Sequence, residues 1–415
     1  MSKKAKKNWD FLEANTKQAS HGFHSYPAML VPQIASELIL EYGKRTSLLF
    51  DPFCGTGTTM VEANLKGLNA IGTDLNPLAR LITKAKTTNI EIQSLDLFIK
   101  DFYDYLFQFR FGFSKKDSVV FPKFTNINFW FGKNVIMDLT IVKNYIDNIK
   151  DLHVKDFFSV AFSQTIRDCS WTRKNEFKLY KMDKDKLKTF KPDVFSSFET
   201  TLSRNRNGLQ NFISLKCPAS TSKVFDFNTV QEIPKNIIAP HSVGLVITSP
   251  PYGDSQTTVA YGQFSRLTNQ WLGNDEAYNL DSSLMGGRKA KEVIKSSSLS
   301  LNRSINKISK LDDGRSRDVV SFYQDYQKSI NNVSKIIKRK GFACYVVSNR
   351  CVKGITLQTH LITKDFFEQS GFTHIETIER KISNKRMPRK NSPIGVTGET
   401  KTLMNKEYIV VMQKK

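Results

Sequence analysis

The sequence lacks the long apolar runs and the cysteine pairs that would indicate a membrane protein or a disulfide-stabilised one. No stretch approaches the roughly 18 consecutive apolar residues of a membrane-spanning helix. The basic N-terminus, Met1 to Lys7, has no apolar signal-peptide core behind it. Five cysteines without close-paired spacing favour neither a disulfide framework nor a zinc site. We therefore expect a cytoplasmic protein with no membrane segment and no bound metal.

Acidic residues are scarce relative to basic ones. The chain has 39 Asp and Glu against 62 Lys and Arg, a formal net charge of +23 over 415 residues. A surplus of this size, interleaved with aromatic residues, indicates a polyanionic partner, most economically nucleic acid. The alternative is a basic surface without such a partner. A chain of this length can hold two domains, or one large domain with insertions.

The first informative motif is a strand, a glycine-rich loop, a helix and a second strand that ends in an acid. Ser47 to Asp51 reads as a strand, Pro52 to Thr59 as the loop, and Met60 to Lys66 as the helix. The strand Ala70 to Thr73 then leads to Asp74. Glycines in this position let the backbone approach a ligand closely, and the acid is placed to bind ribose hydroxyls. The sequence has no Gly-Lys-Ser/Thr triplet, which disfavours a loop that cradles phosphates.

The second motif follows the apolar, buried-strand pattern of Val243 to Ile247. It reads Thr248-Ser249-Pro250-Pro251-Tyr252-Gly253. Because each proline lacks an amide hydrogen, the turn offers carbonyl acceptors, and it ends in an aromatic face. Such a site suits an exocyclic amino group on a flat nucleobase. The alternative is an ordinary proline-rich turn after a strand.

At these motifs the chain resembles the amino-group DNA methyltransferases of restriction-modification systems. The segment from Asp51 to Gly57, together with Asp74, is similar to their S-adenosylmethionine motifs, and Thr248 to Tyr252 is similar to their catalytic motif. Phe23 to Ala28 resembles the segment that precedes the glycine loop in many of these enzymes. The serine form of the catalytic motif is typical of cytosine-N4 enzymes, whereas adenine enzymes more often carry Asp or Asn.

The resemblance implies particular site residues. The catalytic set is Ser249, Pro250, Pro251 and Tyr252. A flipped base would stack on Tyr252, and its amine would donate hydrogen bonds to the Ser249 hydroxyl oxygen and to the Pro250 carbonyl. Near the adenine of the cofactor, Asn228 is an alternative to Asp226. His24 and Tyr26 fit a purely structural role as well as they fit a place in the cofactor pocket. The cofactor set is His24, Tyr26, Asp51, Pro52, Phe53, Cys54, Gly55, Thr56, Gly57, Asp74, Leu75 and Asp226, with Asp51 near the ammonium group and Asp74 on the ribose. Candidate DNA contacts are Arg173, Lys174, Arg204, Arg206, Tyr261, Arg266, Arg288 and Arg386.

The chain divides into four parts by composition. Residues 1–20 form a flexible basic tail, 21–90 the cofactor half of the catalytic domain, and 91–220 a mainly helical and basic insertion. Residues 221–415 form the catalytic half, with a basic loop at 281–318. Aromatic-rich helices are predicted at 96–109, 133–149 and 155–168, whereas the lysine-dense run at 178–191 reads as a solvated face or a DNA contact. The loop at 281–318 is either a flexible insertion or a segment that orders on DNA, and both inserts are candidates for the target recognition region.

Strands alternating with helices favour a doubly wound, mostly parallel α/β sheet. The resemblance implies the class I S-adenosylmethionine-dependent methyltransferase fold, seven-stranded with one antiparallel strand. It also implies methyl transfer to the N4 amino group of a flipped cytosine in double-stranded DNA, and pairing with a cognate restriction endonuclease. No Pro-Cys dipeptide occurs, which argues against methylation of cytosine carbon. The alternatives are an adenine-N6 DNA methyltransferase, an RNA base methyltransferase, and an inactive DNA-binding subunit.

Overall fold

Seven strands form one sheet at the centre of the catalytic domain. The computed structural model describes residues 7–111, 120–174, 176–254, 259–274, 278–293, 295–382, 390–391, 401–402 and 406–415. The strand order is β3-β2-β1-β4-β5-β11-β8, and β11 alone runs antiparallel to its neighbours β5 and β8. The doubly wound fold with one antiparallel strand is therefore confirmed. The strands are β1 Leu48–Asp51, β2 Asn69–Thr73, β3 Ser222–Phe225, β4 Val243–Thr248, β5 Ile337–Ser348, β8 Phe372–Lys381 and β11 Lys406–Lys414.

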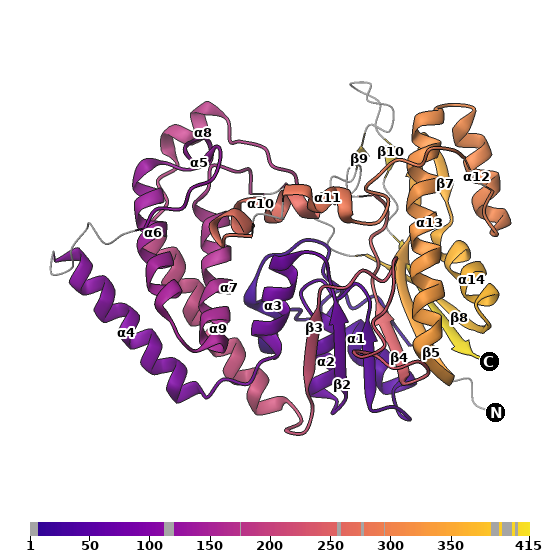
Figure 1. The fold of residues 1–415 in the computed structure, drawn as a ribbon, viewed down its shortest axis with the longest axis horizontal. Helices are drawn as coiled ribbons and strands as arrows, with labels where there is room; N and C mark the ends of the chain where they lie inside the picture. The colour runs from indigo at the N-terminus through magenta and orange to yellow at the C-terminus, as the bar shows by residue number, and fades with distance from the viewer. Residues whose placement is uncertain are drawn as a thin grey trace.

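Helices cover both faces of this sheet (Figure 1). Every residue of β4 is buried, as expected for a central parallel strand covered on both faces. Its Leu245 and Ile247 face the core under one helical layer, and Val246 faces the core under the other. The first layer contains α1 Pro32–Tyr42 and α2 Thr58–Leu65, and the second contains α13 Asp313–Ile336 and α14 Thr359–Gln369. Helix α3 Pro77–Thr87 lies beside the edge strand β3.

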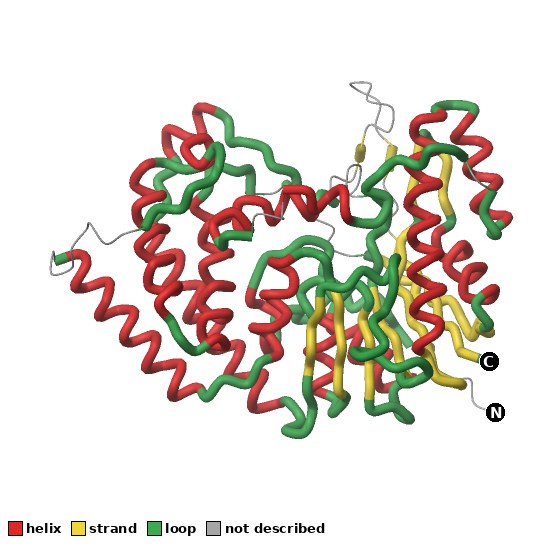
Figure 2. Tube along the Cα trace, viewed as in Figure 1, coloured by secondary structure: helices red, strands yellow, loops and turns green. Residues whose placement is uncertain are grey.

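A block of helices stands beside the sheet, between α3 and β3 in the chain (Figure 2). Phe102, fully buried, is its aromatic centre and contacts the rings of Tyr145, Phe158 and Phe198. The aromatic-rich helices of this region are thus core. The block contains α4 Ile92–Arg110, α5 Ile127–Trp130, α6 Lys133–Asn148, α7 Leu152–Cys169, α8 Lys184–Thr189 and α9 Val194–Leu215, and α10 Tyr261–Trp271 packs against α7.

The region expected to be a loop at 281–318 is mostly helical, so that expectation is wrong. It contains the end of α11 Leu280–Ser283, all of α12 Leu299–Ser309 and the start of α13. The side chains of Leu301, Ile305 and Ile308 recur at helical spacing and are buried against α13 and α14. A low average hydrophobicity therefore concealed a short amphipathic helix.

The N-terminal segment from residue 7 onward is more closely packed than a flexible tail would be. Trp9 is 7% exposed, and its carbonyl accepts a hydrogen bond from Arg380 Nε at 2.9 Å. The 3₁₀ helix η1 Ala19–Phe23 then packs against α9. From residue 7 onward the N-terminal segment is part of the catalytic domain, contrary to the predicted boundary at residue 20.

Short strands complete the fold. β6 Arg350–Val352 pairs antiparallel with β7 Ile355–Leu357, and β9 Lys390–Asn391 pairs antiparallel with β10 Lys401–Thr402. Among the residues described, no helix is both long and apolar enough to cross a membrane.

Replacing Phe102 by Ala should lower the free energy of unfolding by about 3–5 kcal/mol, because it opens a cavity among three packed rings. Phe107 on the same helix is 57% exposed, and Phe107→Ala should change stability by no more than about 0.5 kcal/mol. Urea unfolding followed by circular dichroism measures both values. Equal losses for the two variants would contradict the assignment of Phe102 to the core.

Candidate active site

A cavity opens at the carboxyl ends of β1, β2 and β4, where ligands bind in doubly wound sheets. It encloses about 950 Å³, part of which is open to solvent. The predicted residues that line it come from five separate stretches of the chain. They are Tyr26, Asp51, Pro52, Phe53, Cys54, Gly55, Thr56, Asp74, Leu75, Ser249, Pro251 and Tyr261.

The glycine loop connects β1 to α2 in left-handed backbone conformations. Gly57 has φ +74°, and a Cβ there would come within 2.7 Å of the Thr83 side chain. Gly55 has φ +50°, and a Cβ there would meet no atom within 4 Å, so this part of the loop borders open space. Thr83 Oγ1 donates to the Gly55 carbonyl at 2.9 Å, which fixes the loop on α3. The loop is thus held from behind and leaves its cavity side open to a ligand.

Asp51 is buried at the end of β1, where its carboxylate accepts three hydrogen bonds. Oδ1 accepts from the Phe53 amide at 3.1 Å and from Thr248 Oγ1 at 2.6 Å, and Oδ2 accepts from Thr59 Oγ1. Burial raises the pKa of Asp51 to about 6, although the three donors act in the opposite direction. The carboxylate therefore joins the glycine loop to the strand that carries the catalytic turn.

Asp74 lies at the end of β2 and lines the cavity. Its Oδ2 accepts from the Gly55 amide at 3.0 Å and its Oδ1 from the Asn76 amide at 2.8 Å. Burial raises the pKa of this carboxyl, whereas those two amides and Arg80 oppose the shift. Each oxygen retains lone pairs for a further donor, so the residue fits the role of accepting hydrogen bonds from a ribose.

An aromatic wall closes the cavity beside Asp74. The rings of Tyr26 and Tyr261 stack with centroids 6.1 Å apart. Asn76 Nδ2 donates to Tyr26 Oη at 2.8 Å and to Ser265 Oγ at 3.0 Å, which joins α3 to α10. Tyr261, proposed as a DNA contact, is therefore placed on the wall of the cofactor cavity. The sequence patterns did not single out Asn76 as the residue that connects these walls.

The catalytic turn borders the same cavity. Ser249 and Pro251 line it, whereas Pro250 and Tyr252 lie beside the lining. The Tyr252 hydroxyl donates to Glu407 Oε1 at 2.8 Å and lies 3.5 Å from Ser249 Oγ. The turn thus contacts the antiparallel strand β11, whose contribution no sequence motif indicated.

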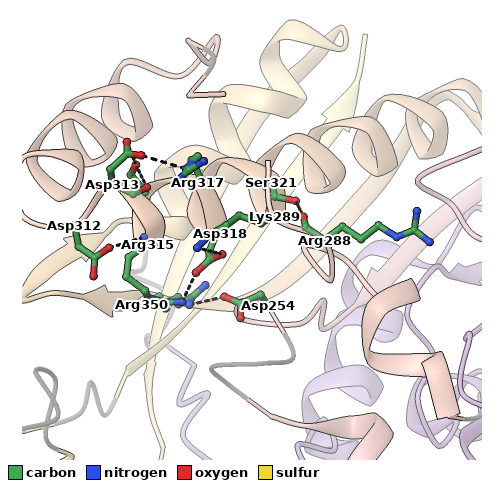
Figure 3. A network of polar contacts seen from close by, with 11 residues as sticks. Asp254, Arg288, Lys289, Asp312, Asp313, Arg315, Arg317, Asp318, Ser321 and Arg350 are labelled. Carbon is green, nitrogen blue, oxygen red and sulfur yellow. Dashed lines mark hydrogen bonds and ion pairs between the residues drawn. The ribbon is translucent and has the colours of Figure 1, made fainter. Parts of the chain in front are cut away.

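A buried ion pair anchors the chain just after this turn. Arg350 Nη2 donates to Asp254 Oδ2 at 2.7 Å, and both side chains are less than 10% exposed (Figure 3). Arg315 and Lys289 pair with Asp318 in the same region. The Arg350–Asp254 pair fixes the end of the catalytic turn to β6, and Lys289 joins the segment after α11 to α13.

Three predicted cofactor residues, His24, Gly57 and Asp226, lie outside the cavity lining. Both ring nitrogens of His24 are buried without a hydrogen-bond partner, and burial lowers its pKa to about 3. His24 packs edge-on against Phe264, which corresponds to the structural role. Asp226 also falls outside, whereas Asn228, the alternative position, lines the cavity. Gly57 supports the loop from behind.

Lys86 is a buried residue near the site that the sequence did not single out. Its Nζ lies 3.4 Å from Thr56 Oγ1 in the glycine loop, and burial lowers its pKa to about 7. Two positions earlier in the same helix, Lys84 is exposed. Nothing in the local pattern separates these two lysines, because only the packing of α3 decides which of them is covered.

Most of the basic residues proposed as DNA contacts are bound within the protein. The Lys174 ammonium donates to the carbonyls of Arg167, Asp168 and Ser170 at the end of α7, and burial lowers its pKa to about 8. Arg206 pairs with Asp96 on α4. The remaining partners are the Phe23 carbonyl for Arg204, and Glu176 and Asp183 for Arg173.

Three proposed contacts remain. Arg266 lies over the Tyr278 ring at 5.7 Å. The Arg288 carbonyl accepts from Ser321 Oγ, and its guanidinium extends away from the charged network (Figure 3). Arg386 lies outside the described residues. Within the described part of the chain, no group of three or more His, Cys, Asp or Glu side chains could hold a metal ion.

The sheet order and the cavity define a class I S-adenosylmethionine-dependent methyltransferase. A family model described as DNA methylase, for N6 and N4 methyltransferases, matches residues 1–84. The chain is 38% identical to type II methyltransferase M.MvaI of Kocuria varians, over 97% of this chain and 93% of that protein. It is 24% identical to type II methyltransferase M.BsoBI of Geobacillus stearothermophilus, over 64% of this chain and 55% of that protein. The chain therefore belongs to the amino-group DNA methyltransferases of restriction-modification systems.

The similarity to solved structures is weaker than the similarity to these sequences. The rRNA methyltransferase aviRa of Streptomyces viridochromogenes aligns with a TM-score of 0.34 at 9% identity, covering 94% of this chain and 88% of that chain. Family membership and the sheet order together imply S-adenosylmethionine as the methyl donor and DNA as the substrate.

The raised pKa of Asp51 predicts a pH-dependent effect on stability. The folded state holds this proton more tightly than the unfolded chain, so its stabilising contribution is largest below about pH 4 and is lost as pH rises to about 6. Relative to the parent, Asp51→Asn should gain about 2 kcal/mol in free energy of unfolding between pH 4.5 and pH 7. Urea unfolding at the two pH values measures this change. If the difference in free energy of unfolding between the parent and Asp51→Asn did not vary with pH, the raised pKa of Asp51 would be contradicted.

Proposed function

We propose that this protein transfers a methyl group to the N4 amino group of cytosine in double-stranded DNA, as the modification enzyme of a restriction-modification system. The observation that carries the proposal is the position of Ser249. It borders the same cavity as Asp51 and Asp74, although about two hundred residues separate the two motifs. The serine form of the turn supports cytosine as the target base.

Cofactor binding is assigned to the two carboxylates and the loop between them. Asp74 accepts hydrogen bonds from the ribose, and Asp51 provides negative charge for the ammonium end. Tyr26 and Tyr261 form an aromatic wall, and the open side of Gly55 lets the backbone approach. When bound, S-adenosylmethionine supplies an electrophilic methyl group on a sulfonium. The two carboxylates and the aromatic wall of the cavity suit the size and polarity of S-adenosylmethionine.

The catalytic turn orients the base. A cytosine in a duplex must leave the stack for its amino group to reach the cavity, at a cost of a few kcal/mol. Stacking on Tyr252 returns about 1–3 kcal/mol. The Ser249 oxygen and the Pro250 carbonyl accept hydrogen bonds from the amine, which favours a tetrahedral nitrogen whose lone pair points into the cavity. Catalysis then depends on orientation and electrostatics, with no covalent enzyme intermediate.

DNA contacts are proposed on the side of the molecule toward which the parallel strands run. Helix α8 lies at the top of the helical block, on the same side as α11 (Figure 1). Its Lys184 and Lys186 are exposed. Arg288, whose guanidinium extends away from the charged network, supplies positive charge after α11. These groups join Arg173 and Arg206, which already have acidic partners at the surface, as proposed phosphate contacts.

Product analysis tests the proposal directly. Purified protein is incubated with tritium-labelled S-adenosylmethionine and unmethylated genomic DNA, and the nucleosides are digested and identified by mass spectrometry. We expect label in 4-methyldeoxycytidine. Label in 6-methyldeoxyadenosine would retain the family and replace the target base. Label only in RNA assayed in parallel would overturn DNA as the substrate. The genome of a host carrying the cognate endonuclease should resist cleavage only while this gene is active.

Removing the Asp74 carboxylate should weaken S-adenosylmethionine binding about tenfold or more, because a charged acceptor for the ribose is lost. Asp226→Ala is the matched control, since Asp226 lies nearby but outside the cavity lining. Isothermal titration calorimetry on both variants measures the affinities. Unchanged affinity in Asp74→Ala would remove the ribose assignment, and a loss in Asp226→Ala would restore that residue to the site.

A further inference from the structure

A carboxylate from β11, which β5 separates from β4 in the sheet, contacts the catalytic tyrosine. Glu407 is the second residue of β11, the strand that runs antiparallel to β5 and β8. Because of this direction, β11 begins at the edge where the parallel strand β4 ends. The Tyr252 hydroxyl donates to Glu407 Oε1 at 2.8 Å. The tip of the tyrosine ring is therefore bound to the sheet by a charged acceptor.

The second oxygen of Glu407 is held from the neighbouring strand. Arg380 on β8 stands directly opposite Glu407 in the sheet register, and its Nη1 donates to Glu407 Oε2. The Arg380 side chain is only 3% exposed, so solvent does not compete for this pair. The carboxylate thus bonds the tyrosine with one oxygen and the arginine with the other.

The arginine is in turn fixed by the N-terminal segment. Arg380 Nε donates to the Trp9 carbonyl at 2.9 Å, and Arg380 Nη2 donates to the Asp10 carbonyl at 3.0 Å. The Lys381 amide donates to Asp10 Oδ1 at 2.7 Å. A chain of contacts therefore runs from the N-terminal segment through Arg380 and Glu407 to Tyr252.

We propose that Glu407 is a positioning residue for methyl transfer, which holds the Tyr252 ring in the orientation that receives the target base. This inference rests on the proposed function, because it assumes that Tyr252 stacks on that base. The bond to Glu407 restricts the two side-chain torsions of the tyrosine. With the bond, the hydroxyl is fixed 3.5 Å from Ser249, so the stacking face and the amine acceptor keep one relative geometry.

The protonation state of the Tyr252 hydroxyl agrees with a positioning role for Glu407. Burial and the nearby Glu407 carboxylate raise the pKa of the Tyr252 hydroxyl well above its ordinary value, so the phenol stays protonated and donates. Glu407 acts through the tyrosine and contacts no reacting atom, which distinguishes it from the residues of the catalytic turn.

Tyr252→Phe provides the cleanest test, because it removes the hydroxyl while leaving the ring and the Glu407–Arg380 pair in place. Loss of a hydrogen bond to a charged group should lower the single-turnover rate of DNA methylation about tenfold. The affinity for S-adenosylmethionine and the thermal midpoint should change little. Rates are measured with labelled cofactor and excess enzyme on unmethylated DNA.

Glu407→Gln, alone and combined with Tyr252→Phe, shows whether the two residues act together. If Glu407 works through the hydroxyl, the second change should lower the rate of the Tyr252→Phe enzyme less than about twofold. Glu379→Gln is the matched control. It breaks an exposed ion pair with Lys406 on the same two strands and should leave the rate unchanged.

Two results would overturn the inference. Tyr252→Phe could retain the parental rate, or the two substitutions could lower the rate multiplicatively. If Glu407→Gln fails to fold because Arg380 loses its partner, the Tyr252→Phe result still decides the question. Failure of the proposed function is recognised separately, because DNA incubated with the parent enzyme would then carry no labelled methyl group.

Discussion

The hydrogen bonds that converge on the Asp51 carboxylate are the constraint on which the site depends. They join the amide of the glycine loop, the first turn of α2 and Thr248 on β4, which lies 197 residues further along the chain. A single buried side chain thereby sets the distance between the cofactor loop and the catalytic turn. The cost is a carboxylate in a poorly solvated place, which is visible in its raised pKa.

The antiparallel strand β11 supplies the second support of the site. A parallel strand in its place would bring its carboxyl end to this edge, whereas β11 brings its beginning there, with Glu407 beside Tyr252. The N-terminal segment, Arg380 and the catalytic turn consequently meet at one point. The structure thus connects Trp9 and Asp10 near the N-terminus, the last strand of the chain and the catalytic turn.

Sequence reasoning succeeded for the sheet but did not reveal the partners of the charged residues. Apolar strands and glycine punctuation are local signals, and β1, β2 and β4 lie within a residue or two of their predicted bounds. Arg206 and Lys174 looked like DNA contacts because the sequence shows charge without showing partners. Arg206 is bound by Asp96, which lies 110 residues away in the chain, whereas Lys174 is bound by carbonyls at the end of the preceding helix α7. The helix α12 was missed because its three buried apolar residues are few among polar ones.

By itself the sequence determined the α/β class, the order of the two motifs and the residues most directly at the cavity. These are properties of local periodicity and of short motifs whose chemistry is contained in their own atoms. Tertiary structure alone decided that Tyr261 faces the cofactor cavity, that His24 is packed away, and that Glu407 contacts Tyr252. Each of these facts depends on which distant segment covers a side chain, and a one-dimensional pattern carries no information about that.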